Sequence, residues 1–271
     1  MHNENEVEYV SKASINNGIC GKVFMVSGAG SGIGAATSRL LLSTGAFVAL
    51  IGRTESTLKE TCKNFSEQQF LIIKADISKE EDIKRAVNLT IERFGRLDGS
   101  FNNAGIFGEF KPLHQESKKN IDEVLAINVC GTLLCMKYQI EALLTSDGGV
   151  IVNCASVAAH LGHSGSAAYS ASKHAIIGMS KSAALQYARQ GIRVNVVSPG
   201  STETPMLRSI YADVNELKLR ANRAPLGRLG KPEEIANAAV WLLSSNSSYV
   251  TGQVIVVDGG VLAGQSAKVK N

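Results

Sequence analysis

The sequence predicts an α/β fold: a single doubly wound parallel sheet with helices on both faces and a small helical lid over the substrate. Short apolar runs alternate with longer segments of helical period along most of the 271 residues. Several runs are apolar at successive positions, which is typical of strands covered on both faces. A long irregular segment interrupts this alternation after residue 200.

Seven apolar runs, each too short for a helix, are the predicted strands. They are 22–28, 47–52, 70–76, 99–105, 150–156, 192–200 and 253–260. The segments of helical period between them are 35–43, 54–64, 79–94, 121–144, 168–189 and 232–243. Strands and helices that alternate through right-handed crossovers build a parallel sheet of the Rossmann type.

The chain is predicted to hold one catalytic domain, residues 20–271, after a loose polar N-terminal tail, residues 1–19. Residues 201–227 follow the sixth strand, and ligands of such sheets bind beyond the carboxyl ends of the strands. We therefore expect 201–227 to form a lid. Its apolar side chains and those after the fourth strand predict a partly apolar pocket: Met206, Leu207, Ile210, Leu217, Ile106 and Phe107.

Composition excludes several classes of protein. Charged residues make up 19% and hydrophobic residues 44%, which suits a folded protein, and the net charge of +4 is dispersed. Its densest basic group, 111–119, contains Glu116 and no aromatic ladder, so we expect no nucleic-acid binding. No apolar run approaches the ~18 residues of a membrane span, so no membrane partner is expected.

Cysteine usage favours a reducing compartment. The five cysteines lack regular CxxC spacing and are predicted to be reduced and mostly buried. The N-terminus is polar and acidic rather than basic and apolar, so the cytoplasm is the expected location. The five are Cys20, Cys62, Cys130, Cys135 and Cys154.

A glycine-rich loop, VSGAGSGIG (26–34), joins the first strand to the first helix. Gly28 suits the tight turn that leaves the strand, Gly32 lets the backbone approach a phosphate, and Gly34 permits close packing of helix on strand. The N–H groups that open the helix can face a pyrophosphate. Taken alone, the loop fits an ordinary tight turn as well as a nucleotide site.

The end of the second strand bears on cofactor choice. NAD-binding folds place a carboxylate there for the ribose 2′-hydroxyl, whereas this chain has Gly52 and Arg53. The Arg53 guanidinium suits a 2′-phosphate, which favours NADP(H) and reduction. The alternative is that Arg53 is a solvated surface residue and that the protein uses NAD(H) for oxidation. Ser31 in the glycine loop is neutral, so it adds no support for NADP(H).

The segment from Tyr169 to Lys173 carries the strongest signal. A spacing of four residues puts both side chains on one face of a helix. A phenol pKa near 10 makes a poor base at neutral pH, and a nearby ammonium lowers that pKa. Ser156 ends an apolar strand 13 residues earlier, where its hydroxyl can bond a carbonyl oxygen. Asn128 lies within a predicted helix, an unfavourable place for Asn. A buried amide there needs hydrogen-bond partners, which suggests a link to water or backbone in a proton path.

At these residues the chain resembles the short-chain dehydrogenase/reductase family, from about residue 22 to 261. The order and spacing of the matches carry the resemblance, and Ser27 stands where the family usually has Thr. The matching segments are 27–34, Asp76-Ile77, 102–105, Asn128, Ser156, Tyr169-x-x-x-Lys173, Pro199-Gly200 and 258–260.

The resemblance implies an NAD(P)-dependent oxidoreductase of ketones and secondary alcohols, assembled as a homotetramer. Tyr169 is then the proton donor or acceptor, Ser156 orients the substrate oxygen, Lys173 holds the nicotinamide ribose and lowers the Tyr169 pKa, and Asn128 helps to relay protons. The implied cofactor contacts are Gly28, Ser31, Gly32, Ile33, Gly34, Arg53, Asp76, Ile77, Asn103, Ala104, Tyr169, Lys173, Pro199, Gly200, Thr202 and Thr204.

Other readings stay open at this point. A protein that senses dinucleotides without chemistry is an alternative, although all four tetrad residues are present. His160 and His163 follow Ser156 and either contact substrate or are solvated, and Cys154 is expected to be a packed thiol. No residues have the spacing of metal ligands.

Overall fold

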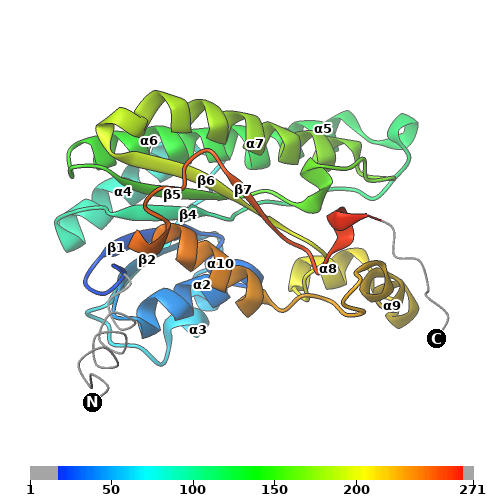
Figure 1. Ribbon diagram of the computed structural model, residues 1–271, viewed down its shortest axis with the longest axis horizontal. Helices are drawn as coiled ribbons and strands as arrows, with labels where there is room; N and C mark the ends of the chain where they lie inside the picture. The colour runs from blue at the N-terminus through cyan, green and yellow to red at the C-terminus, as the bar shows by residue number, and fades with distance from the viewer. Residues whose placement is uncertain (1–17, 265–271) are drawn as a thin grey trace, which may run out of the picture.

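Seven parallel strands form the sheet that organises the protein. In the computed structural model, which describes residues 18–264, the strand order is β3-β2-β1-β4-β5-β6-β7, and all neighbours are parallel (Figure 1). The order reverses between β1 and β4, and this switch point opens a crevice at the carboxyl ends of the strands. The strands are β1 Val23–Ser27, β2 Phe47–Gly52, β3 Phe70–Lys74, β4 Gly99–Asn102, β5 Gly149–Cys154, β6 Ile192–Pro199 and β7 Val254–Val257. The predicted fold class is confirmed.

Helices cover both faces of the sheet (Figure 1). One face carries α2, α3 and α10, which contribute Leu41, Leu58 and Ile235 to one core. The other carries α4 to α7, with Val87 and Met136 in a second core. The helices are α2 Gly32–Ser43, α3 Glu55–Cys62, α4 Glu80–Phe94, α5 Lys118–Leu125, α6 Thr132–Leu144, α7 Ala167–Tyr187 and α10 Pro232–Leu243.

The central strands contribute side chains to the cores on both faces of the sheet. In β1, Phe24 and Val26 pack into the core under α2, whereas Met25 packs into the opposite core. Side chains of a strand point alternately to the two faces, so a strand covered on both sides is apolar at every position. This explains why the runs that predicted the strands lack polar alternation.

Two elements differ from the prediction: the fourth strand is shorter, and the helix predicted over 121–144 is interrupted. The fourth strand ends at Asn102 instead of residue 105, because residues 103–105 turn out of the sheet to line the crevice. The predicted helix 121–144 is interrupted by a π-helical turn, η2 Ala126–Gly131. Such turns are frequent at functional sites, and this one contains Asn128.

Two further predictions concern the N-terminal tail and the cysteines. The predicted tail falls outside the described residues except for Gly18 and Ile19, and Ile19 is fully buried in the core. Of the five cysteines, Cys20 and Cys130 are exposed, and the remaining three are buried as predicted. Among the helices of residues 18–264, none has the length and hydropathy needed to cross a membrane.

The predicted lid contains two short helices, α8 Pro205–Ile210 and α9 Val214–Arg223, beyond the carboxyl end of β6 (Figure 1). Each begins at a side-chain cap: Thr204 Oγ1 accepts a hydrogen bond from Leu207 N, and Asp213 accepts one from Asn215 N. Pro205 occupies the first turn of α8, where its fixed φ is favourable.

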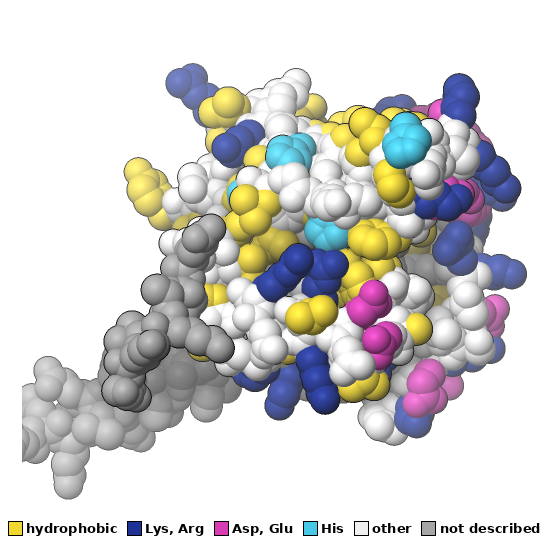
Figure 2. All heavy atoms as spheres, turned by 90° about the vertical axis from the view of Figure 1, so that its right-hand side faces the viewer, with side chains coloured by type: hydrophobic (Ala, Val, Ile, Leu, Met, Phe, Trp, Pro, Cys, Tyr) yellow, Lys and Arg dark blue, Asp and Glu magenta, His cyan; other side chains and the backbone are white. Residues whose placement is uncertain are grey.

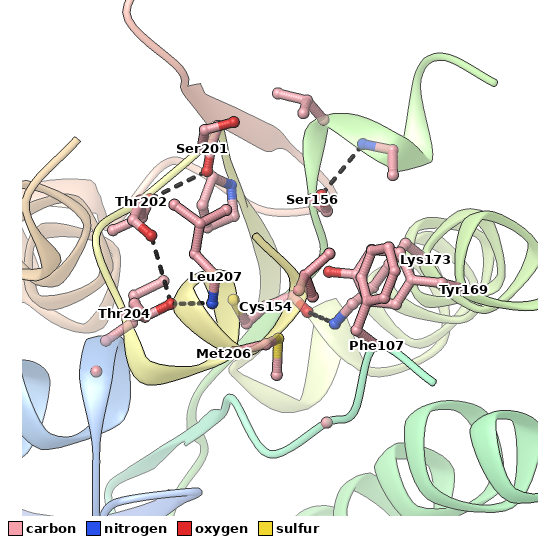
Figure 3. A pocket seen from close by; sticks show the side chains of 18 of the residues that line it. Phe107, Cys154, Ser156, Tyr169, Lys173, Ser201, Thr202, Thr204, Met206 and Leu207 are labelled. Atoms are coloured by element: carbon pink, nitrogen blue, oxygen red, sulfur yellow. Dashed lines mark hydrogen bonds between the residues drawn. The ribbon is translucent and has the colours of Figure 1, made fainter. Parts of the chain in front are cut away.

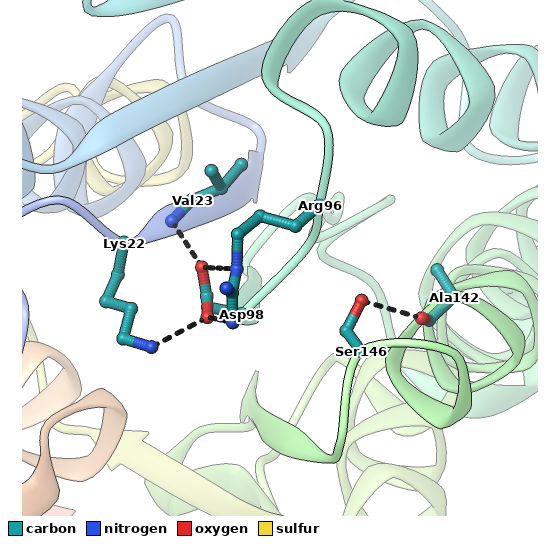
Figure 4. Close-up of polar contacts among 6 residues, drawn as sticks. All are labelled: Lys22, Val23, Arg96, Asp98, Ala142 and Ser146. Atoms are coloured by element: carbon teal, nitrogen blue, oxygen red, sulfur yellow. Dashed lines mark hydrogen bonds and ion pairs between the residues drawn. The ribbon is translucent and has the colours of Figure 1, made fainter.

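At the opposite edge of the sheet, Asp98 ties the start of β1 to the start of β4 (Figure 4). Its carboxylate accepts hydrogen bonds from Val23 N at 2.9 Å, Lys22 Nζ at 3.1 Å and two nitrogens of Arg96. The Asp98 side chain is only 9% exposed, so these bonds replace most of its water contacts.

We expect Asp98→Asn to lower the free energy of unfolding by about 2 to 4 kcal/mol, because the amide presents N–H groups to donors in a buried position. The exposed pair of Lys118 and Asp122 gives the matched control, and Asp122→Asn should cost about 0.3 to 0.5 kcal/mol. Urea unfolding of both variants measures the difference. Equal losses of unfolding free energy in the two variants would show that the buried bonds of Asp98 do not stabilise the junction of β1 and β4.

Candidate active site

A cavity of about 340 Å³ opens at the carboxyl edge of the sheet, between the glycine loop, β5, α7 and the lid. In Figure 3, α7 and the segment after β5 face the residues of the lid across this pocket. Most predicted site residues line it: Gly28, Ser31, Gly32, Ile33, Asn103, Ala104, Ser156, Tyr169, Lys173, Pro199, Gly200, Thr202 and Thr204. Asn128, Gly34, Arg53, Asp76 and Ile77 do not.

The glycine loop adopts backbone conformations that other residues rarely take. Gly28 has φ +66° and Gly32 has φ +51°, and α2 begins at Gly32, which lines the cavity together with Ile33. A Cβ on Gly28 would lie 2.9 Å from Ala104 Cα, and one on Gly32 would lie 3.0 Å from a Thr204 carbon. Gly34 lies behind the cavity, where a Cβ would collide with the Gly28 carbonyl oxygen.

Ser27 joins the end of β1 to the loop after β4. Its Oγ accepts hydrogen bonds from Asn103 N at 3.1 Å and Ala104 N at 3.2 Å. Asn103 Nδ2 in turn donates to the carbonyl oxygens of Ser27 and Gly28, both at 3.4 Å. A serine hydroxyl is sufficient for these bonds, which explains why Thr is not required at this position.

Ser156, Tyr169 and Lys173 meet at the deep end of the cavity (Figure 3). Ser156 follows β5 and caps a short turn, its Oγ accepting from Ala158 N at 3.1 Å. On α7, Lys173 is buried and donates from Nζ to the Cys154 carbonyl oxygen at 2.9 Å, and this nitrogen lies 5.6 Å from the Tyr169 ring centroid.

Burial controls the protonation of this group. Desolvation raises the pKa of Tyr169, and a hydrogen bond with the Ser156 hydroxyl opposes the shift without cancelling it. Desolvation also lowers the pKa of Lys173 and raises the pKa of the Cys154 thiol. In the protein alone, burial therefore outweighs the lowering of the Tyr169 pKa that the sequence predicts from Lys173. The neutral Cys154 thiol agrees with its predicted role as a packed side chain.

Asn128 lies outside the cavity but is fully buried and fully bonded. Its Oδ1 accepts from Ile106 N at 2.8 Å, and its Nδ2 donates to Ile106 O at 2.8 Å and to Ser172 Oγ at 3.0 Å. Ser172 donates to the Tyr169 carbonyl oxygen at 2.7 Å. Asn128 thus links the loop after β4 to the turn of α7 that carries Tyr169. The sequence did not single out Ser172, although a polar residue three positions after Tyr169 was a usable signal.

Arg53, Asp76 and Ile77 lie at the ends of β2 and β3 on the same edge of the sheet. Arg53 is exposed, and Ile77 is buried beside Ala104. Burial of the Asp76 carboxyl raises its pKa, but hydrogen bonds from Ser78 and the charge of Arg53 outweigh it, so the pKa is lowered. These residues extend the crevice beyond the cavity.

An aromatic wall connects the deep end of the cavity to the lid. The Phe107 ring lies 4.7 Å from that of Tyr169 and 6.3 Å from that of Phe110, and Phe110 lies 6.0 Å from Tyr211, between centroids. His163 also lines the cavity, against Phe107, whereas His160 Nε2 lies 3.1 Å from Ser198 Oγ and is not among the lining residues.

The predicted apolar lining holds with exceptions. Phe107, Met206, Leu207 and Ile210 line the cavity, and Ile106 lines an adjoining hollow, whereas Leu217 lines neither. Sequence reasoning missed Leu161, Tyr211, Arg220, Arg223 and Val261. Tyr211 follows α8 and both arginines lie on the polar helix α9, so no local pattern marks them as cavity residues.

Known proteins resemble this chain over most of its length. A family model described as enoyl-(acyl carrier protein) reductase matches residues 28–262. The 2,5-dichloro-2,5-cyclohexadiene-1,4-diol dehydrogenase of Sphingobium indicum is 42% identical over 247 residues, 90% of this chain and 98% of that protein. The cyclohexanol dehydrogenase of an Acinetobacter species is 38% identical over 258 residues, 93% and 98% of the two chains.

A solved structure has the same fold. The 3-ketoacyl-(acyl-carrier-protein) reductase of Brucella melitensis, complexed with NADH, superposes with a TM-score of 0.84 at 31% identity. The match covers 90% of this chain and 99% of that one.

The close approach at Gly28 can be tested by stability. Gly95 also has a positive φ, +80°, but a Cβ there would meet nothing within 4 Å. We expect Gly95→Ala to cost about 1 to 2 kcal/mol for the left-handed backbone alone. Gly28→Ala should cost about 2 kcal/mol more, because its methyl group also collides with Ala104. Denaturant unfolding gives both values, and similar losses would show that the loop yields to a side chain.

Proposed function

The chain belongs to the short-chain dehydrogenase/reductase family and is an NAD(P)-dependent oxidoreductase of CH–OH and C=O groups, and we propose that it reduces a cyclic ketone with NADPH, using Tyr169 as the proton donor. The observation that carries this proposal is that Ser156, Tyr169 and Lys173 line one cavity together with the glycine loop. The reacting oxygen, the proton source and the cofactor can meet there.

The glycine loop supports the assignment of the cofactor site. A Cβ on Gly28 or Gly34 would collide with Ala104 or with the Gly28 carbonyl oxygen, so the glycines let the loop pack tightly beside the α2 N-terminus, where N–H groups attract phosphate. The nicotinamide cofactor, when bound, supplies or accepts the hydride. We assign the phosphates to Gly28–Gly34 and Thr204, the adenine to Asp76 and Ile77, and the ribose and nicotinamide to the remaining residues: Asn103, Ala104, Lys173, Pro199, Gly200 and Thr202.

The hydroxyls of Tyr169 and Ser156 have complementary roles in the proposed reduction. Burial keeps the Tyr169 phenol protonated at neutral pH, which is the state needed to give a proton to a developing alkoxide. Ser156 Oγ accepts from Ala158 N, and in the protein alone its hydroxyl bonds that of Tyr169; in the proposed complex the Ser156 proton is donated to the substrate oxygen instead.

Lys173 and Asn128 complete the proposed tetrad. Lys173, buried and bound to the Cys154 carbonyl, presents its remaining donors to the ribose. Asn128 is assigned a positioning role, because Ile106 and Ser172 occupy its amide. A proton relay at Asn128 would follow those contacts toward α7.

Oxidation of an alcohol with NAD is the alternative. The complex of the Brucella reductase with NADH supports NAD as the cofactor, and the names of both curated relatives, which are dehydrogenases, support oxidation. Arg53 favours NADP(H), because no carboxylate ends β2 to bind a ribose 2′-hydroxyl. A dinucleotide sensor without chemistry has less support, since the Ser156, Tyr169 and Lys173 side chains converge.

A six-membered ring is the proposed substrate skeleton. The names of the two curated relatives contain cyclohexadienediol and cyclohexanol. Phe107, Met206 and Leu207 give the cavity the apolar walls that such a ring needs.

We also propose a cytoplasmic homotetramer with a single catalytic domain, residues 20–271. Exposed apolar side chains on the helices α5, α6 and α7 support assembly through these helices. They are Leu125, Leu133 and Leu185.

Tyr169→Phe should lower kcat for ketone reduction by about 10² to 10⁴-fold, because the proton donor is lost, while the Kd for the cofactor changes little. Tyr187→Phe, on the same helix but outside the cavity, is the control and should keep full activity. Steady-state kinetics and fluorescence titration of the cofactor measure both. Unchanged turnover in Tyr169→Phe would rule out this mechanism.

Arg53→Ala should weaken NADPH binding by about 10 to 100-fold and leave NADH binding unchanged, because a charge-assisted bond to the 2′-phosphate is lost. Lys63→Ala, an exposed cation at the end of α3, is the control. Titration of each variant with both cofactors provides the test. If the unmodified protein binds NAD(H) more tightly, Arg53 does not read a phosphate.

A further inference from the structure

Two arginines of the lid line the cavity and have no carboxylate partner in the part of the chain that the structure describes. Arg220 and Arg223 lie three residues apart on α9, on one side of that helix. Within residues 18–264, neither makes an ion pair or a hydrogen bond to a carboxylate. Glu216 is the acid whose charge acts on Arg220, but it forms no ion pair with it. On the lid-bearing face, basic side chains lie beside a histidine above a hydrophobic hollow (Figure 2).

Tyr211 adds a second, independent observation. It lines the same cavity, is only 5% exposed, and its hydroxyl is buried with no hydrogen-bond partner among the described residues. A buried hydroxyl without a partner is costly, so a ligand is expected to supply one. The Arg220 guanidinium carbon lies 4.3 Å from the centroid of the Tyr211 ring, which holds the cation against this hydroxyl-bearing residue.

The position of this group relative to Tyr169 fits a substrate rather than the cofactor. The rings of Phe107, Phe110 and Tyr211 lead in consecutive contacts from Tyr169 to the lid. The glycine loop, where the phosphates are assigned, contacts the lid at Thr204 instead. Phe107, Tyr211 and Arg220 line the same cavity as Tyr169, so a ring held against Phe107 has space to extend toward Arg220.

The neighbouring histidine does not compete for this role. Burial lowers the pKa of His163, and the charges of Arg220 and Arg223 lower it further. Its Nδ1 lies 2.8 Å from Ser166 Oγ. His163 is thus neutral near pH 7, and the positive charge at this end of the cavity comes from the arginines.

We propose that Arg220, Arg223 and the Tyr211 hydroxyl form an anion-binding subsite, and that the substrate carries a carboxylate at the end of the molecule opposite the reacting carbonyl or hydroxyl group. The guanidinium fork matches the two oxygens of a carboxylate, and the Tyr211 hydroxyl supplies a third donor. This inference rests on the proposed function, because it concerns the substrate of the same cavity.

A pair of ketones of nearly equal size tests the subsite: 4-oxocyclohexanecarboxylate and its neutral carboxamide. The unmodified enzyme should reduce the acid with a kcat/KM about 10 to 100-fold above that of the amide, as expected for a charge-assisted bond. Arg220→Gln combined with Arg223→Gln should bring this ratio close to one. Arg220→Lys keeps the charge but loses the planar fork, and should give an intermediate ratio.

Arg208→Gln is the matched control. Arg208 is an exposed arginine of the lid that pairs with Glu203 and does not line the cavity. This variant should keep the ratio of the unmodified enzyme. Circular dichroism and thermal unfolding of all variants verify the fold. A ratio near one in the unmodified enzyme, or a ratio that the arginine variants leave unchanged, overturns the subsite while the proposed function stands.

Binding separates the two proposals if neither ketone reacts. Absence of turnover for both ketones with either cofactor counts against the proposed function on this class of rings. Calorimetric titration of cyclohexanecarboxylate into the protein, with and without cofactor, then decides on the subsite. Binding at least tenfold weaker in the double variant supports it, and equal binding overturns it. A matching loss of NADPH affinity in the double variant would assign the arginines to the cofactor and also overturn it.

Discussion

The crevice depends on the contact between the chain leaving β1 and the chain leaving β4. Two backbone N–H groups, from Asn103 and Ala104, converge on the Ser27 hydroxyl, and Gly28 passes so close to Ala104 that a side chain has no room. This contact sits where the strand order reverses. Because it holds the glycine loop against the 103–107 loop, the helix N-terminus and the aromatic wall face one shared space.

A second constraint is the desolvation of Tyr169 and Lys173. Burial favours the neutral phenol of Tyr169 and disfavours the ammonium of Lys173, and the Cys154 carbonyl oxygen offsets part of the second cost through its 2.9 Å hydrogen bond. Desolvation therefore has a larger effect than neighbouring charges on the protonation of Tyr169 and Lys173. A phenol near bulk water would have neither this bias nor the Phe107 ring at 4.7 Å to fix its direction.

The sequence sufficed for the sheet, because most strands are buried on both faces and are apolar at successive positions. It also predicted that Ser156, Tyr169, Lys173 and the glycine loop lie together, and these residues line one cavity. It did not reveal the π-helical turn at Asn128, since the apolar period continues through 121–144 and the break accompanies contacts with Ile106, 22 residues away. It also missed Arg220 and Tyr211. On a polar helix, Arg220 has the same local pattern as a solvated charge, and only the tertiary fold brings it to the cavity.

The proposed catalytic residues and the proposed substrate-binding residues lie on different parts of the fold, the first on α7 and the turn after β5 and the second on the lid. Lys173 is buried on α7, and Ser156 caps the turn that follows β5. By contrast, no residue within α8 or α9 is buried, and the second lid helix is anchored by Tyr211 before it and Ala224 after it. An element with so few buried contacts opens at low free energy. A lid helix that moves can admit the substrate, and Arg220 and Arg223 can then close on the substrate's far end beside the anchored Tyr211, without disturbing the Tyr169 hydroxyl.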